Sequence, residues 1–282
     1  MFTNLWIALP NSSISDEQTR RDKSIKISIF ARACSIFRVK RIYIYHDKTS
    51  QIDKNDSDIL KTILSYLDTP QYLRKILYPQ MPELEYAGKL HPIKSPHHKK
   101  FEDIRNIKAG DVRVGVLVRH RGASYVELGL GTLAQYDGTG GADGQKINVK
   151  FTSVYPNLRV TEASLDDIKD HYWGYEVREV LNLNKLLKES KNDTQIVITS
   201  KKGTYFKNKE NILTRRLKSS RNLLIVFGSP KKGVAEILAS EGQTLKRHEF
   251  IVNMFPFQGT ETVRLEEAVI GTLAIFNHVM SK

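Results

Sequence analysis

Alternation of strand-like and helix-like segments at both ends of the chain, around a glycine-rich middle, most constrains its fold. Residues 5–9 form an apolar run that stops at Pro10, and residues 41–46 form a β-branched and aromatic run. Both patterns are typical of buried strands. Two helices are expected in this part of the chain: residues 22–39, with a buried apolar face at Ile25, Ile29, Ala33 and Ile36, and residues 56–77, with a new start at 68–70.

The middle of the chain changes character between residues 111 and 160, where glycines separate short β-type runs. This spacing predicts a small all-β barrel of the OB type. The run Gly129–Ala134 matches G-x-G-x-x-A, but no helix pattern follows it, so it indicates barrel backbone and not a dinucleotide site. The expected strands of the barrel include residues 112–118, 125–128, 132–136 and 146–154.

Helix and strand alternate again from about Tyr172 to the C-terminus. Strands are expected at 174–180, 196–199, 223–227 and 250–253, and helices at 183–188, 213–219, 234–240 and 263–280. Two strands alone in residues 1–86 would make a poor sheet. We therefore predict one α/β domain, residues 1–86 with 171–282, into which residues 87–170 are inserted as a barrel; three sequential domains are the alternative.

The net charge of +13 favours a polyanionic partner, and nucleic acid is the leading class. Residues 171–282 hold 18 Lys and Arg against 11 Asp and Glu, which is +7 of that excess. A generally basic, solvated surface is the alternative. Cys34 is the single cysteine, which excludes internal disulfides, and its neighbours predict a buried thiol. We expect a cytoplasmic protein because neither a membrane-length apolar run nor a signal peptide is visible.

Three loops in the last third follow predicted strands and share small and polar residues: 199–203, 228–233 and 253–260. Ligands bind outside the carboxyl ends of strands in open α/β sheets, so these loops are candidates for one shared site. For each loop alone, simple turn formation explains the composition as well. A phosphate at Lys231 and Lys232 is a rival interpretation, although no P-loop motif occurs.

Histidines 91, 97 and 98 lie in a Pro-, His- and Lys-rich segment, 91–100, without periodicity. No carboxylate stands among them at helical ligand spacing, so we expect no metal site. The segment is predicted to be a linker or a flexible basic arm that contacts RNA.

The third loop opens the run 253–268, NMFPFQGTETVRLEEA, which resembles the cofactor-binding end of SPOUT, or α/β-knotted, RNA methyltransferases. The branch with an inserted OB-like domain is the most similar. Weaker resemblances lie at 8–10, 31–37, 172–178, 199–200 and 226–228, so that the likeness spans nearly the whole chain. Family members often place glycine after Gly228, whereas this chain has Ser229 and Pro230.

The resemblance implies a SPOUT-type knotted open sheet that binds S-adenosyl-L-methionine, and a homodimer whose partner chain completes the active site. From the histidine spacing and the short apolar runs we expect neither a metal nor a membrane partner. The expected pocket has backbone donors, apolar walls and few fixed charges. By resemblance, the cofactor-binding residues are Thr199, Ser200, Gly203, Phe227, Gly228, Ser229, Asn253, Pro256, Gln258, Gly259, Thr260, Val263 and Arg264.

The resemblance further implies methylation of an RNA base, with ribosomal RNA as the substrate and uridine N3 as the target. Arg32 and Arg264 are the candidates to orient the nucleophile or favour it electrostatically, and Asn253 to position it. A structural ion pair is the alternative for each arginine. A noncatalytic RNA-binding or ribosome-assembly factor and a nucleotide-dependent enzyme are the competing functions. Aromatic side chains that OB barrels use to stack bases are expected at Tyr125, Tyr136, Phe151 and Tyr155, about half of them in the core.

Overall fold

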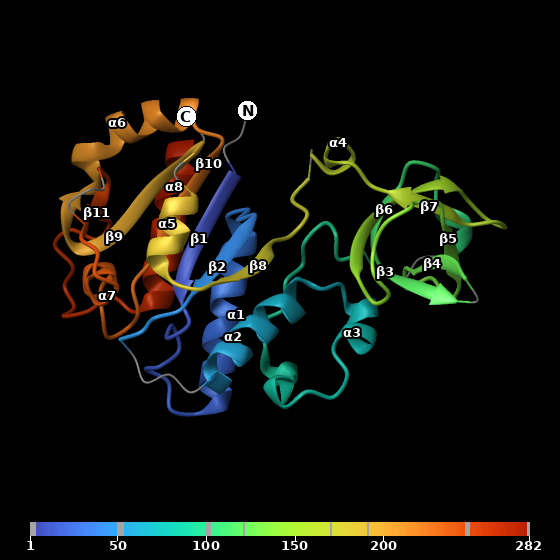
Figure 1. Ribbon diagram of the computed structural model, residues 1–282, viewed down its shortest axis with the longest axis horizontal. Coiled ribbons are helices and arrows are strands. Elements are labelled where there is room, and N and C mark those ends of the chain that lie inside the picture. The colour runs from blue at the N-terminus through green and yellow to red at the C-terminus, as the bar shows by residue number, and fades with distance from the viewer. Residues whose placement is uncertain are drawn as a thin grey trace. The chain divides into compact units, whose positions relative to one another are not determined.

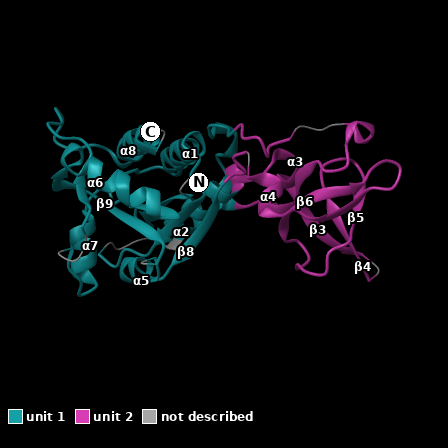
Figure 2. Cartoon of the chain, turned by 90° about the horizontal axis from the view of Figure 1, so that it is seen from above, with its two compact units in different colours: residues 1–65, 82–93, 175–282 teal, residues 66–81, 94–174 magenta. Residues whose placement is uncertain are grey.

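A computed structural model describes residues 4–49, 54–99, 103–120, 122–169, 171–190, 192–245 and 249–280. It separates into two compact units (Figure 2). Unit 1 comprises residues 1–65, 82–93 and 175–282, and unit 2 comprises residues 66–81 and 94–174. The functional domains expected at 1–86 with 171–282 and at 87–170 stay a prediction.

Unit 1 is built on a six-stranded parallel sheet with the order β11-β9-β10-β1-β2-β8 (Figure 1). The predicted α/β class is therefore confirmed, and the strands come from both ends of the chain. The strands are β1 (Asn4–Pro10), β2 (Arg41–Tyr45), β8 (Glu176–Val180), β9 (Thr194–Tyr205), β10 (Asn222–Val226) and β11 (Ile251–Asn253).

Helices cover both faces of this sheet, with α5 and α7 on one face and α1 and α8 on the other (Figure 2). Ala8, Leu224 and Val226 point to the first face and pack against Leu186 and Ile237. The helices are α1 (Arg20–Ile36), α2 (Lys54–Asp68), α5 (Leu183–Glu189), α6 (Phe206–Ser219), α7 (Val234–Ser240) and α8 (Leu265–Met280), with 3-10 turns at Pro82–Leu84 and Ala87–Lys89.

The expected buried face of α1 is wrong in part. Ile36 is 60% exposed, and the core residues of the helix are Ile27, Phe30, Ala31 and Cys34, together with the predicted Ala33. The face is rotated because polar side chains are buried with partners; Lys26, for example, is 3% exposed and forms ion pairs. Cys34 is fully buried as predicted, and burial raises the pKa of its thiol far above the ordinary range.

Unit 2 contains a closed five-stranded barrel with the order β3-β4-β5-β7-β6, in which β5 and β7 are parallel. Gly129 and Gly131 lie in the turn between two of its strands, so the G-x-G-x-x-A match is barrel backbone as predicted. The elements are α3 (Gln71–Leu77), a 3-10 turn at Ile104–Asn106, β3 (Val112–His120), β4 (Ala123–Glu127), β5 (Leu133–Tyr136), β6 (Lys146–Ser153), β7 (Arg159–Glu162) and α4 (Leu165–Ile168).

Helix α3 packs on the barrel. The hydroxyl of Tyr72 donates a 2.7 Å hydrogen bond to the carbonyl of Val114, and Leu73 is buried with Val114 and Val116. A Cβ on Gly129 would lie 2.4 Å from the ring of Tyr72, so this close approach requires glycine. Of the four aromatic residues expected to bind bases, Tyr136 and Phe151 are buried in the barrel core, while Tyr155 is 50% exposed.

The prediction of a flexible arm at residues 91–100 is wrong for the three histidines, because each of them has a hydrogen-bonding contact. Lys100 lies outside the described residues. His97 is 2% exposed, and Nε2 of both His97 and His98 lies within 2.9 Å of the carbonyl oxygen of Asp68. In unit 1, Nδ1 of His91 lies 2.7 Å from the hydroxyl of Ser28. The segment is held by these contacts although it has no helix or strand.

Candidate functional site

Three loops, one within the C-terminal part of β9 and one after each of β10 and β11, meet around one pocket of about 500 Å³, which is a size typical of small-molecule sites. They lie at the carboxyl ends of three adjacent parallel strands, as the sequence predicted. The pocket is lined by Thr199–Lys202, Phe227–Gly233, Ala235, Glu236, Asn253–Phe255, Gln258, Glu261–Val263, Leu265, Ala268 and Thr272.

The first loop, residues 199–203, is an excursion within β9. Ile198 pairs with Ile251, and the next pair is Thr204 with Val252, so the residues between them leave the ladder. Gly203 closes the excursion: a Cβ there would lie 2.7 Å from the backbone of Val252. Glycine is therefore required for strand packing at this position.

The second loop, residues 227–233, is a closed turn. Ser229 N donates to the carbonyl of Lys232 at 2.8 Å, and Ser229 Oγ accepts from Lys232 N at 2.9 Å. A Cβ on Gly228 would lie 2.7 Å from that same carbonyl oxygen. The serine at 229 thus has a structural use, because its hydroxyl holds the turn shut.

The second loop is also anchored by Tyr45, at the end of β2. Its hydroxyl donates a 2.6 Å hydrogen bond to the carbonyl of Phe227, and both side chains are buried. Burial raises the pKa of Tyr45 well above its usual value, and the nearby carboxylates of Asp47 and Glu241 add to the shift. Tyr45 therefore stays protonated and keeps donating over the whole physiological range.

The third loop, residues 253–264, is fixed by side-chain amides. Asn253 Nδ2 donates to the carbonyl of Lys201 at 2.9 Å, and Asn253 Oδ1 accepts from Phe255 N at 2.9 Å. Gln258 Nε2 donates to the carbonyls of Thr260 and Glu261 at 2.9 and 3.0 Å. The bond to Lys201 joins the third loop to the first, and the other three bonds fix the third loop internally.

Helix α8 forms one wall of the pocket through Leu265, Ala268 and Thr272, which lie on one helical face. Thr272 is completely buried, and its hydroxyl has no hydrogen-bond partner among the described residues. A buried hydroxyl without a partner is costly, and rotation of the Thr272 side chain toward the pocket would let it bond a polar ligand atom.

The walls carry more charge than the sequence led us to expect, because four lysines and two glutamates line the pocket. Lys201 Nζ donates to the carbonyl of Glu261, and Lys232 Nζ to that of Thr49, each at 2.7 Å. Glu236 Oε2 accepts from Gly233 N at 2.9 Å at the start of α7. That carboxylate occupies the position where a phosphate would bind, which argues against the phosphate interpretation.

Eight of the predicted cofactor-binding residues line the pocket: Thr199, Ser200, Phe227, Gly228, Ser229, Asn253, Gln258 and Val263. Five do not: Gly203, Pro256, Gly259, Thr260 and Arg264. Gly203, Thr260 and Arg264 instead shape the loops or the start of α8; Arg264 N, for example, donates to Glu267 Oε2 at 2.9 Å. Arg32 does not line the pocket either, and its guanidinium donates to the carbonyl of Pro92 at 2.8 Å.

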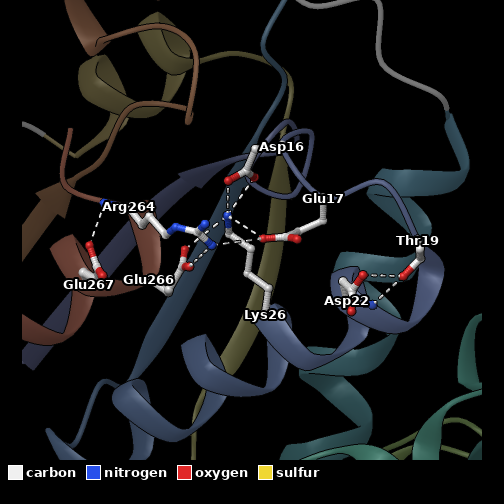
Figure 3. Close-up of polar contacts among 8 residues, drawn as sticks. All are labelled: Asp16, Glu17, Thr19, Asp22, Lys26, Arg264, Glu266 and Glu267. Atoms are coloured by element: carbon white, nitrogen blue, oxygen red, sulfur yellow. Dashed lines mark hydrogen bonds and ion pairs between the residues drawn. The ribbon is translucent and has the colours of Figure 1, made fainter. Parts of the chain in front are cut away.

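A buried ion cluster supports the loop that carries Arg264 (Figure 3). Lys26 Nζ on α1 lies 2.6 Å from Asp16, 3.6 Å from Glu17 and 3.1 Å from Glu266. The guanidinium of Arg264 is 66% exposed and lies 4.0 Å from Glu17 and 3.8 Å from Glu266. The cluster ties the start of α8 to α1, and the arginine side chain points toward its carboxylates while staying largely exposed.

Several pocket residues were not among the predicted contacts, and Thr272 and Phe255 are two examples. Thr272 could have been found as the polar residue on the apolar stripe with Leu265 and Ala268. Phe255 could not: its ring lies against Gly271, where a Cβ would be 2.6 Å away, and this is visible only in the structure.

No group of three or more His, Cys, Asp or Glu side chains suited to a metal ion occurs within the described ranges. Across the same part of the chain, none of the helices has both the length and the apolar character needed to span a bilayer.

Comparison with known proteins gives a full-length match. The model of a family described as "Putative RNA methyltransferase" matches residues 4–276. The human 28S rRNA (uridine-N(3))-methyltransferase is 27% identical over 296 residues, which cover 96% of this chain and 77% of the human protein. Its Drosophila melanogaster counterpart is 29% identical over 308 residues, 96% of this chain and 61% of the fly protein. An uncharacterized protein of Halobacterium salinarum is 25% identical over 284 residues, 95% of this chain and 96% of its own length.

Proposed function

We propose, from the premise that this chain belongs to the RNA methyltransferase family whose model spans it, that it methylates a base in RNA with S-adenosyl-L-methionine as the methyl donor. The observation that carries the proposal is the single pocket formed by three loops at the carboxyl ends of β9, β10 and β11. Loops in that position are where open α/β sheets bind their ligands.

The pocket residues fit this cofactor in three respects. The volume of about 500 Å³ suits a ligand of that size. The unpartnered hydroxyl of Thr272 offers a hydrogen bond to a buried polar atom. Lys202 and Lys231, and Glu236 and Glu261, are lining residues that can pair with the carboxylate and ammonium groups of the methionine moiety.

When bound, S-adenosyl-L-methionine supplies an electrophilic methyl group on its sulfonium sulfur. We assign its binding to the predicted residues that line the pocket and to Thr272. Of the other predicted contacts, Gly203 and Thr260 act by shaping the loops, and the backbone of Arg264 caps the start of α8. A part for Pro256 and Gly259 in cofactor binding stays a prediction. Asn253 has both ends of its amide engaged within the loops, so we propose that it positions the pocket walls.

Arg264 is our candidate to orient the base. Its guanidinium is exposed while Glu17 and Glu266 hold its direction, so it can reach an incoming polyanion or a developing negative charge. Arg32 is 2.8 Å from a backbone carbonyl of its own chain, and a catalytic part for it stays a prediction.

We propose ribosomal RNA as the substrate and N3 of a uridine as the target, because the human and fly relatives carry names that state this activity. The barrel would bind RNA as an OB-type module, and its strand order with a parallel closing pair is compatible with that class. Of its four candidate aromatics, Tyr125 and Tyr155 remain available for stacking, since Tyr136 and Phe151 are buried.

The finer parts of the fold are proposals as well. We propose that the C-terminal segment forms the SPOUT knot, which is supported by the non-sequential placement of β11 beside β9. We propose a homodimer, supported by the exposed Ile36 and Ile270 on α1 and α8, two helices that pack against each other. A cytoplasmic location stays a prediction.

The test is to incubate the protein with methyl-labelled S-adenosylmethionine and unmodified large-subunit ribosomal RNA, and then to map the label. We expect label on a uridine, where N3 methylation removes the Watson–Crick donor and stops primer extension. Cofactor binding without any label in RNA would favour a noncatalytic RNA-binding factor. Thermal stabilisation by ATP or NAD, and none by S-adenosylmethionine, would favour a nucleotide-dependent enzyme.

A further inference from the structure

The excess positive charge is concentrated in unit 1. Its residues include 30 Lys and Arg against 20 Asp and Glu, whereas unit 2 has 14 against 11. Helix α6 has the highest density of positive charge: residues Phe206–Ser219 include five basic residues and one acidic residue. The five are Lys207, Lys209, Arg215, Arg216 and Lys218.

Lys207, Arg215 and Lys218 of α6 are exposed, whereas Lys209 is partly buried and Arg216 lies 3.7 Å from Glu249. Phe206, Leu213 and Leu217 form the buried face, and the ring of Phe206 lies 5.4 Å from that of Phe276 on α8. Helical geometry places Arg215 opposite that face, and it is exposed. The fourteen residues make a basic surface about 21 Å long.

Ordinary helix stabilisation explains only part of this pattern. Arg216 and Lys218 lie in the last turn, where cations complement the helix dipole. Lys207 and Lys209 lie at the other end, where the first turn holds no acidic residue. Cations there oppose the dipole, so their presence is a cost that an anionic partner would offset.

An exposed aromatic pair adjoins this basic end. Tyr205 precedes α6 and is 41% exposed, Phe257 in the third loop is 88% exposed, and their rings lie 5.3 Å apart. Phe257 has a φ of +60°, which is strained for a bulky residue. Because Phe255 and Gln258 on either side of this segment line the pocket, the pair stands at its rim.

We propose that the basic face of α6 and the Tyr205–Phe257 pair bind single-stranded RNA next to the target base. The phosphates lie along Lys207, Arg215 and Lys218, and a base stacks on Phe257, as in other single-strand sites. This rests on the proposed function and adds a substrate surface on the catalytic unit. A second copy of the chain fits the helix poorly, since a symmetric contact would bring two sets of like charges together.

The charge test compares two triple variants of the full-length protein. Lys207→Gln/Arg215→Gln/Lys218→Gln removes three cations from α6, and Lys61→Gln/Lys185→Gln/Lys188→Gln removes three exposed cations from α2 and α5. The measured quantities are the affinity for a fluorescent 12-nucleotide oligouridine as a function of salt, and the affinity for S-adenosylmethionine.

For the α6 variant we expect a slope of log Kd against log salt that is smaller by about 2, because each lost single-strand contact removes about 0.7. Its affinity for S-adenosylmethionine should equal that of the wild type, and the α2/α5 variant should keep the wild-type slope. Equal slopes for both variants would overturn the inference while leaving the methyltransferase proposal intact. Absence of cofactor binding and of methylation in the wild type would instead refute the proposed function.

The aromatic test uses Phe257→Ala and Phe257→Tyr, which remove and retain the stacking ring. Phe257 is so exposed that neither change disturbs the core. We expect Phe257→Ala to bind the oligouridine about tenfold more weakly and Phe257→Tyr to bind it like the wild type. Unchanged RNA affinity in Phe257→Ala overturns the inference. Dissociation of a wild-type dimer by Phe257→Ala in size-exclusion chromatography also overturns it, because the aromatic pair would then contact a second copy of the chain.

Discussion

Asn253 on the third loop and Lys201 on the first are joined by a hydrogen bond of 2.9 Å from a side-chain amide to a backbone carbonyl. The two loops leave neighbouring strands of the sheet, β11 and β9. Asn253 is nearly buried, so water competes little for this bond. The two loops are therefore held together by this amide and by the 2.7 Å bond from Lys201 Nζ to the carbonyl of Glu261.

Asn253→Asp should weaken the binding of S-adenosylmethionine by about tenfold. The carboxylate can still accept from Phe255 N, but it sets an oxygen against the carbonyl of Lys201. Isothermal titration calorimetry would measure the affinity, and single-turnover methylation the chemical step. A normal affinity with slow methyl transfer would show that Asn253 acts on the nucleophile instead.

Thr272→Val should separate ligand binding from stability. The change removes a buried hydroxyl that has no partner among the described residues, so the free energy of unfolding should stay equal or rise by about 1 kcal/mol. Affinity for S-adenosylmethionine should fall about five- to tenfold. Thr214→Val, which removes a 2.8 Å bond to the carbonyl of Glu210, is the matched control and should leave that affinity unchanged. A wild-type affinity in Thr272→Val would mean that the ligand does not use this hydroxyl.

Lys26→Met should lower the free energy of unfolding by about 3–5 kcal/mol, because it leaves three carboxylates without their buried cation (Figure 3). Lys185→Met on α5 is the control: Lys185 pairs with Glu189 at the surface and its side chain is 54% exposed, so we expect a loss of at most about 1 kcal/mol. Urea denaturation followed by circular dichroism would measure both. Equal losses of unfolding free energy in the two variants would show that the Lys26 cluster stabilises the fold no more than a single ion pair does.

Stability should fall as the pH rises from 10 to 12. Burial raises the pKa of Tyr72 to about 12, against the lowering influence of the Arg113 guanidinium. In that window the native state holds a proton that the unfolded state has released, so unfolding becomes more favourable by up to about 1.4 kcal/mol per pH unit. Tyr72→Phe should flatten the curve of unfolding free energy against pH, and Tyr155→Phe, at a half-exposed ring, should not.

The order of elements was predictable from the sequence because the apolar periods of strands and helices are local. Residues 41–46 and 223–227, for example, were expected as strands within one residue of their observed ends. The rotation of α1 was not predictable, because it depends on partners far along the chain, such as Glu266 for Lys26. The ordered position of His97 could not be predicted for the same reason, since its partner Asp68 lies 29 residues away in the sequence.

The sequence predicted which three loops form the site, but it did not predict where their side chains point. Composition marked residues 199–203, 228–233 and 253–260, and parallel strands bring such loops together. Arg32 and Arg264 could be placed on their elements, yet only the structure shows Arg32 bonded to a backbone carbonyl and Arg264 close to two carboxylates. Long polar side chains have many rotamers, and tertiary contacts select among them.

The contact between Tyr72 and Val114 decides how this protein can be divided. A fragment that begins at residue 94 would contain every strand of the barrel, yet it would leave Val114 and Val116 without the cover of Leu73 and open a hollow over Gly129. The smallest autonomous piece must therefore retain residues 66–81, joined to the rest by a designed bridge in place of 82–93.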